Sequence, residues 1–151
     1  MSELKMWAVL ADDTPLSLGK AVAMAGHAYG NLFEDARASH PELMAAYTGR
    51  RAPGEPVTQG QAKITVRAKN RAALLRAYDE AVAAGLPAML VRDEGRSEVE
   101  PGTPVIVVFG PARRDDLPKF LYKLQRLDPP KKDEAVPVTG VPFETAAKED
   151  A

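Results

Sequence analysis

The fold is decided by residues 85–111, which read GLPAMLVRDEGRSEVEPGTPVIVVFGP. Two apolar runs in this stretch, Ala88–Val91 and Val105–Phe109, are short, rich in β-branched side chains and bounded by Pro and Gly. Such runs are typical of buried strands. The polar segment between them, 92–104, carries carboxylates, a serine and two glycines. A polar loop held between core strands predicts a place where a rigid scaffold presents functional side chains; the alternative is a solvated connection.

The residues before this stretch predict a strand followed by a helix. Ala62–Arg67 alternates in polarity, and residues 70–84 have the apolar spacing of a helix. Asn70 is expected to cap this helix, and Gly85 to end it in the left-handed conformation that glycine adopts freely. Residues 62–92 should therefore form a strand–helix–strand unit with a right-handed parallel crossover.

The N-terminal part of the chain predicts another strand and a long helix. Leu4–Ala11 is largely apolar, and the helix is expected from Leu16 to about Ala36 with Ser17 as its N-cap. The side chains expected to face the core recur at helical spacing: Leu18, Val22, Ala25, Tyr29 and Leu32 or Phe33.

The remaining segments complete the predicted fold. A short helix capped by Ser39 is expected over Pro41–Tyr47, and a last amphipathic helix from Asp115 or Asp116 to Leu127. The order β-α-α-β-α-β-β-α predicts an α/β fold, a three-layer α/β/α sandwich on a small mixed four-stranded sheet. A chain of 151 residues suits one domain, predicted at 1–127, followed by a Pro-rich, flexible tail at 128–151.

The composition excludes several classes of protein. The chain has no cysteine, which excludes disulfides and thiol nucleophiles. It shows neither the pattern of a signal peptide nor a membrane-spanning run, so a cytoplasmic location without membrane association is expected. The net charge of −1 does not suggest a dedicated nucleic-acid-binding domain. Six of the 21 acids but only three of the 20 basic residues lie from Asp128 onward, which leaves the predicted domain slightly basic.

Candidate functional residues gather on the first helix. Lys20, His27 and Asn31 share one face, opposite the predicted core stripe. Lys20 lies in the first turn, where free N–H groups and the helix dipole favour anions. A solvent-facing lysine and a satisfied core-edge histidine are the alternatives. No metal site is expected, because the only other histidine is His40 and no metal-ligand spacing occurs. Ser97 lacks the glycines of a nucleophile elbow, which argues against a serine triad.

Short motifs follow one another along residues 4–127: Gly19-Lys20, His27-Ala28, Gly60-Gln61-Ala62-Lys63, Ala84-Gly85-Leu86-Pro87, Val91-Arg92-Asp93, Gly95-Arg96-Ser97-Glu98, Pro101-Gly102-Thr103 and Gly110-Pro111. In this order and spacing they resemble the type 2 peptidyl-tRNA hydrolases. The resemblance implies cleavage of the ester between a peptide and the 3′ end of tRNA, with no metal or cofactor. It also implies tRNA as partner, a homodimer and a cytoplasmic protein.

The resemblance also implies roles for individual residues. Those implied to be catalytic are Lys20, His27, Asp93 and Ser97, and those implied to bind substrate are Asn31, Lys63, Gly95, Arg96 and Thr103. Lys20 would hold a phosphate or the developing oxyanion, and Asp93 would orient a water or hold Lys20. Ser97 stands where the family usually has threonine, which keeps the hydroxyl.

Three positions depart from the family pattern. Met24 replaces a glutamine, Val105 replaces a threonine, and Glu94 adds a negative charge where a small residue is usual. They leave two alternatives open: a protein that binds tRNA or a protein partner without hydrolysis, and an enzyme for a different acyl substrate. A basic cluster could track an RNA backbone or be a solvated face; its members are Lys63, Arg67, Lys69 and Arg71.

Overall fold

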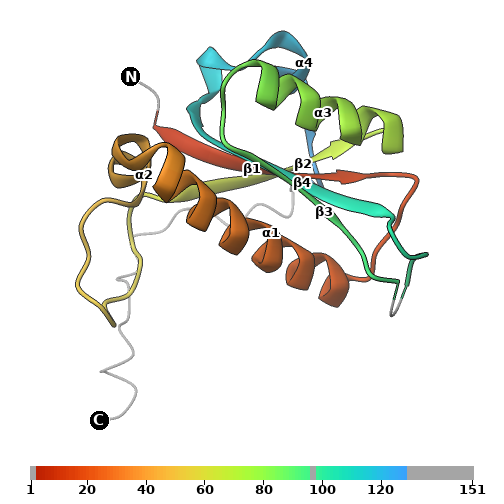
Figure 1. Ribbon diagram of the computed structural model, residues 1–151, viewed down its shortest axis with the longest axis horizontal. Helices are drawn as coiled ribbons and strands as arrows, with labels where there is room; N and C mark the ends of the chain where they lie inside the picture. Colours follow the sequence, from red (N-terminus) through yellow and green to blue (C-terminus); the bar gives the residue numbers. More distant parts are fainter. Residues whose placement is uncertain (1–2, 96–97, 129–151) are drawn as a thin grey trace, which may run out of the picture.

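A mixed sheet separates two layers of helices in the computed structural model, which describes residues 3–95 and 98–128 (Figure 1). The strands are β1 (Leu4–Ala11), β2 (Ala62–Ala68), β3 (Ala88–Arg92), β4 (Pro104–Arg113) and β5 (Gln125–Arg126), in the spatial order β3-β4-β1-β2-β5. On one face lie α1 (Leu18–Ser39) and α2 (Pro41–Thr48), and on the other α3 (Arg71–Ala83) and α4 (Lys119–Tyr122). The predicted three-layer α/β fold is confirmed, with five strands instead of four.

The directions of the strands bring three carboxyl ends to one edge of the sheet. β1 pairs parallel with β2 and antiparallel with β4, and β3 pairs antiparallel with β4. β1, β2 and β3 therefore run the same way, as the predicted parallel crossover from β2 to β3 requires. β4 and β1 lie between the two strands that this crossover joins.

The two faces of the sheet bury separate apolar clusters. On the α3 side, Trp7 stacks on Phe109 with ring centroids 5.3 Å apart, and Leu74 of α3 is fully buried against them. On the α1 side, Met6 packs with Leu32 and other buried residues. β4 serves both clusters, because alternate side chains of its run 106–109 point to opposite faces. The segment predicted as a continuous apolar strand is thus buried on both faces.

Over its first turns, α1 packs on the core with the face opposite to the predicted one. Ser17 caps α1 as predicted, its hydroxyl accepting from the Lys20 N–H at 3.2 Å. Leu18 and Val22, however, are 81% and 63% exposed. The buried residues form a row spaced four apart: Ala28, Leu32 and Ala36. The small side chain of Ala28 lets α1 lie close to the sheet. The prediction instead followed the larger apolar side chains, such as Leu18 and Val22, which lie on the other face.

The same row of residues extends toward the start of α1. Steps of four lead back from Ala28 to Met24 and Lys20, both of which are half-buried. The face predicted to be opposite the core is therefore the inward one at this end of the helix. Lys20 is directed toward β3 because it continues the row that packs α1 on the sheet.

Two further boundaries differ from the sequence-based expectations. Ser39 ends α1 and donates to the Asp35 carbonyl, and His40 stands at the N-cap of α2 without a side-chain cap. The predicted last helix is divided into a 3₁₀ turn (Arg114–Asp116), α4 and β5. Pro118 separates the first two, since it lacks an N–H and disfavours helical geometry at the preceding residue. Apart from Asp128, the predicted tail lies outside the described residues.

Candidate functional site

The loop after β3 fixes an aspartate at the sheet edge where the three parallel strands end. Asp93 directly follows β3, and its N–H donates to the Thr103 carbonyl at 2.9 Å. Its own carbonyl accepts from the Gly102 N–H at 2.7 Å. These two bonds continue the β3–β4 pairing past a register shift at Val91 and Arg92. Asp93 is consequently buried, with 7% of its surface exposed.

An ion pair joins this loop to α1. Lys20 Nζ lies 2.7 Å from Asp93 Oδ1, with the two side chains 17% and 6% exposed. One partner comes from the first turn of α1 and the other from the end of β3, 73 positions later. A pair so sheltered from water is held more rigidly than a surface pair, since solvent screens it less.

The second carboxylate oxygen of Asp93 is held by the backbone. The Gly95 N–H donates to Asp93 Oδ2 at 2.7 Å. Hydrogen bonds from Lys20 and Gly95 favour the charged form and lower the pKa of Asp93 below its usual value. Asp93 is therefore a carboxylate at neutral pH, and its negative charge faces the Lys20 ammonium.

Gly95 is required by geometry. Its φ is +82°, a conformation that side chains rarely allow, and a Cβ at this position would lie 2.5 Å from the nitrogen of Pro101. The tight turn around Gly95 aims its N–H at the aspartate. The glycine that the resemblance assigned to substrate binding thus positions Asp93 in this structure.

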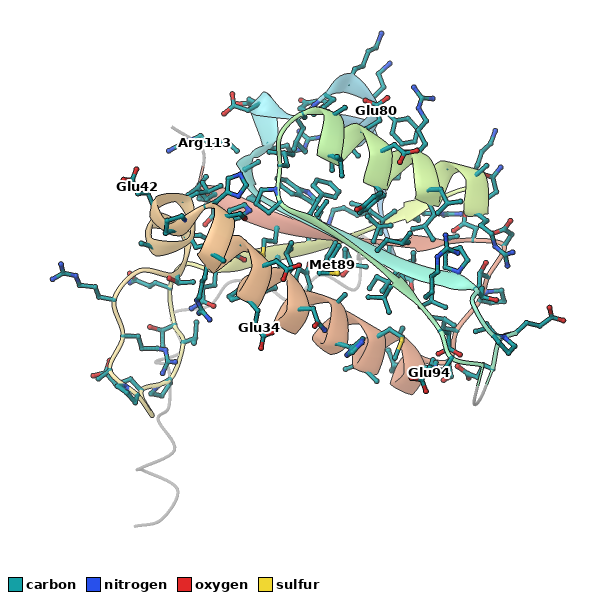
Figure 2. All side chains as sticks on the ribbon, viewed as in Figure 1. Glu34, Glu42, Glu80, Met89, Glu94 and Arg113 are labelled. Carbon is teal, nitrogen blue, oxygen red and sulfur yellow. The ribbon has the colours of Figure 1, made fainter. Side chains whose placement is uncertain are left out.

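A pocket of about 350 Å³ opens beside the ion pair. Its lining combines charged, aromatic and apolar side chains from α1 and the end of β3: Lys20, Met24, His27, Val91, Arg92, Asp93 and Glu94. Three of the residues predicted to be catalytic therefore meet here. Figure 2 shows Glu94 beside the first turns of α1, where its charge adds to that of Asp93. Met24 occupies the wall between Lys20 and His27.

The other predicted site residues lie elsewhere or play structural parts. The Asn31 amide donates to the His27 carbonyl at 2.8 Å and does not line the pocket. The Thr103 hydroxyl donates to the Glu100 carbonyl at 2.7 Å, which fixes the loop from within. Arg96 and Ser97 lie outside the described residues. Val105 is 2% exposed in the α1-side core, away from the pocket lining.

Lys63 lies in an aromatic environment at the start of β2. Its ammonium is between 5.2 and 5.5 Å from the ring centroids of Tyr29, Phe33 and Tyr47. Burial lowers the pKa of Lys63, and its ammonium donates to the Gln61 carbonyl at 3.1 Å. The amino end of β2 is at the opposite edge of the sheet from Asp93, so Lys63 cannot share the pocket.

Sequence reasoning missed two contributors to the site. Arg92 lines the pocket, and its guanidinium donates to the Gly102 carbonyl at 3.1 Å. Glu98 accepts from the Ser17 N–H, with both carboxylate oxygens 3.3 Å away. A capping box would place Glu or Gln at the third helical position, where this chain has Lys20. That missing acid is the signal that another segment must supply the acceptor.

Two other kinds of feature are absent from the described ranges, a metal-binding cluster and a membrane-spanning helix. Residues 3–95 and 98–128 contain no cluster of three or more His, Cys, Asp or Glu arranged to hold a metal ion. Within the same ranges no helix has the length and apolar character needed to cross a membrane.

Comparison with known proteins gives a consistent result. The family model described as Peptidyl-tRNA hydrolase PTH2 matches residues 4–127. A peptidyl-tRNA hydrolase of Methanocaldococcus jannaschii is 33% identical over 124 residues, which cover 82% of this chain and 100% of the relative. A peptidyl-tRNA hydrolase of Aeropyrum pernix is 38% identical over 105 residues, which cover 69% of this chain and 80% of the relative. The structure of a protein of unknown function, Atu0240 from Agrobacterium tumefaciens C58, is similar in fold, with a TM-score of 0.52 and 16% identity over 84% of this chain and 99% of that one.

Proposed function

The chain belongs to the Peptidyl-tRNA hydrolase PTH2 family, and from this premise we propose that it hydrolyses the ester joining a peptide to the 3′ end of tRNA. The observation that carries the proposal is the buried Lys20–Asp93 pair, which opens onto a pocket of about 350 Å³. A fixed ammonium and a fixed carboxylate side by side supply the two things that ester hydrolysis needs. These are a donor for the oxyanion and an acceptor that positions a water.

Lys20 stabilises the negative charge that develops on the ester carbonyl. An ammonium has three donors, and only one is engaged by Asp93 Oδ1. A remaining N–H can reach a carbonyl oxygen in the pocket, where limited exposure strengthens the interaction. Asp93 in turn keeps the lysine side chain in place.

Asp93 orients the attacking water. Its carboxylate has lone pairs beyond those used by Lys20 and Gly95, and one of them accepts a hydrogen bond from water. The water oxygen adds to the carbonyl carbon, the bond to the ribose 3′-oxygen breaks, and a proton from the water ends on that oxygen. We assign the transfer of this proton to His27, which lines the same pocket.

The remaining predicted residues take supporting parts in this proposal. Gly95 and Thr103 position the Asp93 loop through their backbone and hydroxyl contacts. Arg96 and Ser97, which follow Gly95 in sequence, are assigned to the substrate by the resemblance alone. Asn31 and Lys63 would contact RNA farther along α1 and β2. A cytoplasmic homodimer, also implied by the resemblance, belongs to the same proposal.

A second candidate is a protein that binds tRNA through this pocket without hydrolysing it. Two observations favour it. Met24 puts an apolar side chain between Lys20 and His27, and Glu94 places a negative charge at a site meant for RNA. Neither disturbs the Lys20–Asp93 pair, whose geometry is intact.

The test is release of an N-acetylaminoacyl group from tRNA by the wild type and by Lys20→Met and Asp93→Asn. We expect wild-type turnover, and a fall of about 10²- to 10³-fold in kcat/KM for each variant because a preorganised charged group is removed. Lys119→Met and Asp79→Asn make the same chemical changes on the exposed surface and should be neutral. A wild type that retards tRNA on a gel but releases nothing would establish the binding protein instead.

A further inference from the structure

A second concave region lies on the α3 side of the sheet. It is a groove of about 690 Å³ between the end of β2, the first turns of α3 and the segment that joins α4 to β5. Its polar lining is mostly cationic, with Arg67, Lys69, Arg76 and Lys123 against the single acid Asp12. We refer to these five residues and the space between them as the basic groove.

The topology explains why a groove forms there. The chain leaves β1 toward α1 on one face of the sheet and leaves the adjacent β2 toward α3 on the other. Neighbouring parallel strands whose following helices lie on opposite faces leave a crevice beyond their carboxyl ends, which is a usual ligand site in α/β folds. Asp12 follows β1 and Lys69 follows β2, so both stand at that crevice.

The cations of the basic groove differ in how firmly they are held. Arg67 is paired with Asp12, with Nη2 at 2.6 Å from Oδ2. The Arg76 guanidinium carbon lies over the ring of Phe120, 4.1 Å from its centroid, and Arg76 contacts Glu80 at the long distance of 3.4 Å. Lys69 and Lys123 are exposed, and neither forms an ion pair with an acid in the described part of the chain. The groove thus offers positive charge that no acid within residues 3–95 and 98–128 neutralises by an ion pair.

The spacing of these charges selects a backbone over a single anion. They come from three separate parts of the chain: the end of β2, the first turns of α3 and the residue after α4. The ring of Phe120 carries a guanidinium on its face, so that face does not offer a base a stacking surface. The arrangement therefore fits successive phosphates of a nucleic-acid strand, without recognition of its bases.

The basic groove and the Lys20–Asp93 pocket share one edge of the sheet. Asp93 follows β3 and Lys69 follows β2, and β4 and β1 lie between these strands. Three strand spacings separate the two ends by about 14 Å along the edge. A nucleic-acid strand advances about 3.4 Å per nucleotide, so roughly four nucleotides connect the two places. In addition, Asp13 accepts from the Arg71 N–H at 3.2 Å, which ties the approach to α1 to the start of α3.

We propose that the basic groove binds the phosphodiester backbone of the same RNA whose acylated 3′ end enters the Lys20–Asp93 pocket. This inference rests on the proposed function for the identity of the RNA. It adds a contact several nucleotides from the ester, which raises affinity for long substrates and does not act on the reacting atoms.

The test compares a long and a short substrate with a variant that removes two unpaired charges, Lys69→Gln/Lys123→Gln. We expect the KM for N-acetylaminoacyl-tRNA to rise about tenfold with kcat unchanged, as for loss of two phosphate contacts. The same ester on the terminal adenosine alone should be hydrolysed as by the wild type. The slope of log KM against the logarithm of the salt concentration should decrease by about 1.4 to 1.8, because two phosphate contacts are lost.

A matched control is Arg50→Gln/Arg51→Gln, which removes two charges from the exposed segment between α2 and β2. It should leave both substrates unaffected. An unchanged KM for tRNA in the Lys69/Lys123 variant, or an equal loss on both substrates, would overturn the proposal.

Different results would refute the proposed hydrolase function and the proposed role of the basic groove. If the wild type hydrolyses neither substrate, the proposed function is wrong, and the groove is then judged by fluorescence anisotropy with uncharged tRNA. About tenfold weaker binding by Lys69→Gln/Lys123→Gln than by the control supports the groove, and equal binding refutes it.

Discussion

The two concave regions at the edge of the sheet differ in how they use charge. In the Lys20–Asp93 pocket, opposite charges lie 2.7 Å apart and are nearly closed off from solvent. In the basic groove, four cationic side chains lie against the single acid Asp12, and these charges are largely exposed. The first arrangement holds single atoms in place, as bond cleavage requires. The second attracts a long polyanion and holds no single atom in place. Within one fold, bond cleavage and the binding of the rest of the substrate are thus assigned to different regions.

Among changes that leave Lys20 and Asp93 in place, the largest expected effect comes from Gly95→Ala, which breaks the rigidity of the pocket. The added Cβ would collide with Pro101 and must also tolerate a φ of +82°, so the N–H that holds Asp93 is displaced. A displacement of about 1 Å at a catalytic group can cost on the order of 10² in rate. We expect a loss of that size in kcat, with little change in KM for tRNA.

Gly54→Ala is the matched control for backbone strain. Gly54 lies in the exposed segment between α2 and β2 and has a φ of +87°, but a Cβ there would meet no atom within 4 Å. It should cost only the roughly 1–2 kcal/mol of a left-handed residue, measured by denaturant unfolding. A Gly95→Ala protein as active as Gly54→Ala would show that the Gly95 contact does not position Asp93.

The titration of Asp93 should move when its partner is removed. The pKa of Asp93 is lowered in the folded protein, first by the hydrogen bond from Lys20. Such a group stabilises the fold above its unfolded pKa, and this stabilisation is lost as the pH falls through the lower folded pKa. In Lys20→Met the carboxyl should titrate at higher pH, followed by the NMR shift of its carbon. Lys119→Met should leave the titration in place, and an unmoved midpoint in Lys20→Met would contradict the ion pair.

The smallest expected effect tests the apolar wall of the pocket. Met24→Gln would return an amide to the face between Lys20 and His27. One added hydrogen bond of about 1 kcal/mol corresponds to roughly a fivefold gain in kcat/KM. Met89→Gln introduces the same group beneath α1, beside the buried cluster, and should lower stability without such a gain (Figure 2). No gain from Met24→Gln would mean that the pocket is already complete without that amide.

Sequence reasoning reached the layers of the fold because they depend on local signals. Asn70 caps α3, as its residue type predicts, and its Oδ1 accepts a hydrogen bond from the Ala73 N–H at 2.8 Å. β5 escaped prediction because two residues carry no periodicity, and their pairing with Val66 and Arg67 is purely tertiary. The predicted orientation of the first turns of α1 was wrong, because burial there is decided by Ala28, whose small side chain contributes little to an apolar pattern.

The candidate site was predictable in part for the same reason. Lys20, His27 and Asp93 were found from the helix face, the polar loop and the resemblance, and the structure brings them to one pocket. Asn31 and Lys63 lie outside it, because a shared helix face or motif does not fix which edge of the sheet a residue reaches. The basic groove draws on β2, α3 and the residue after α4, and only the fold brings these segments together.

The row that runs from Ala28 back to Lys20 has a consequence for how this chain can change. Each residue of an α-helix turns the ones before it by about 100°, so one residue inserted between Lys20 and Ala28 would carry the lysine around the helix. The apolar core would be untouched, yet Lys20 would point away from Asp93. Substitutions in this segment are therefore tolerable in a way that insertions and deletions are not. The length of the helix between core and pocket is itself part of the site.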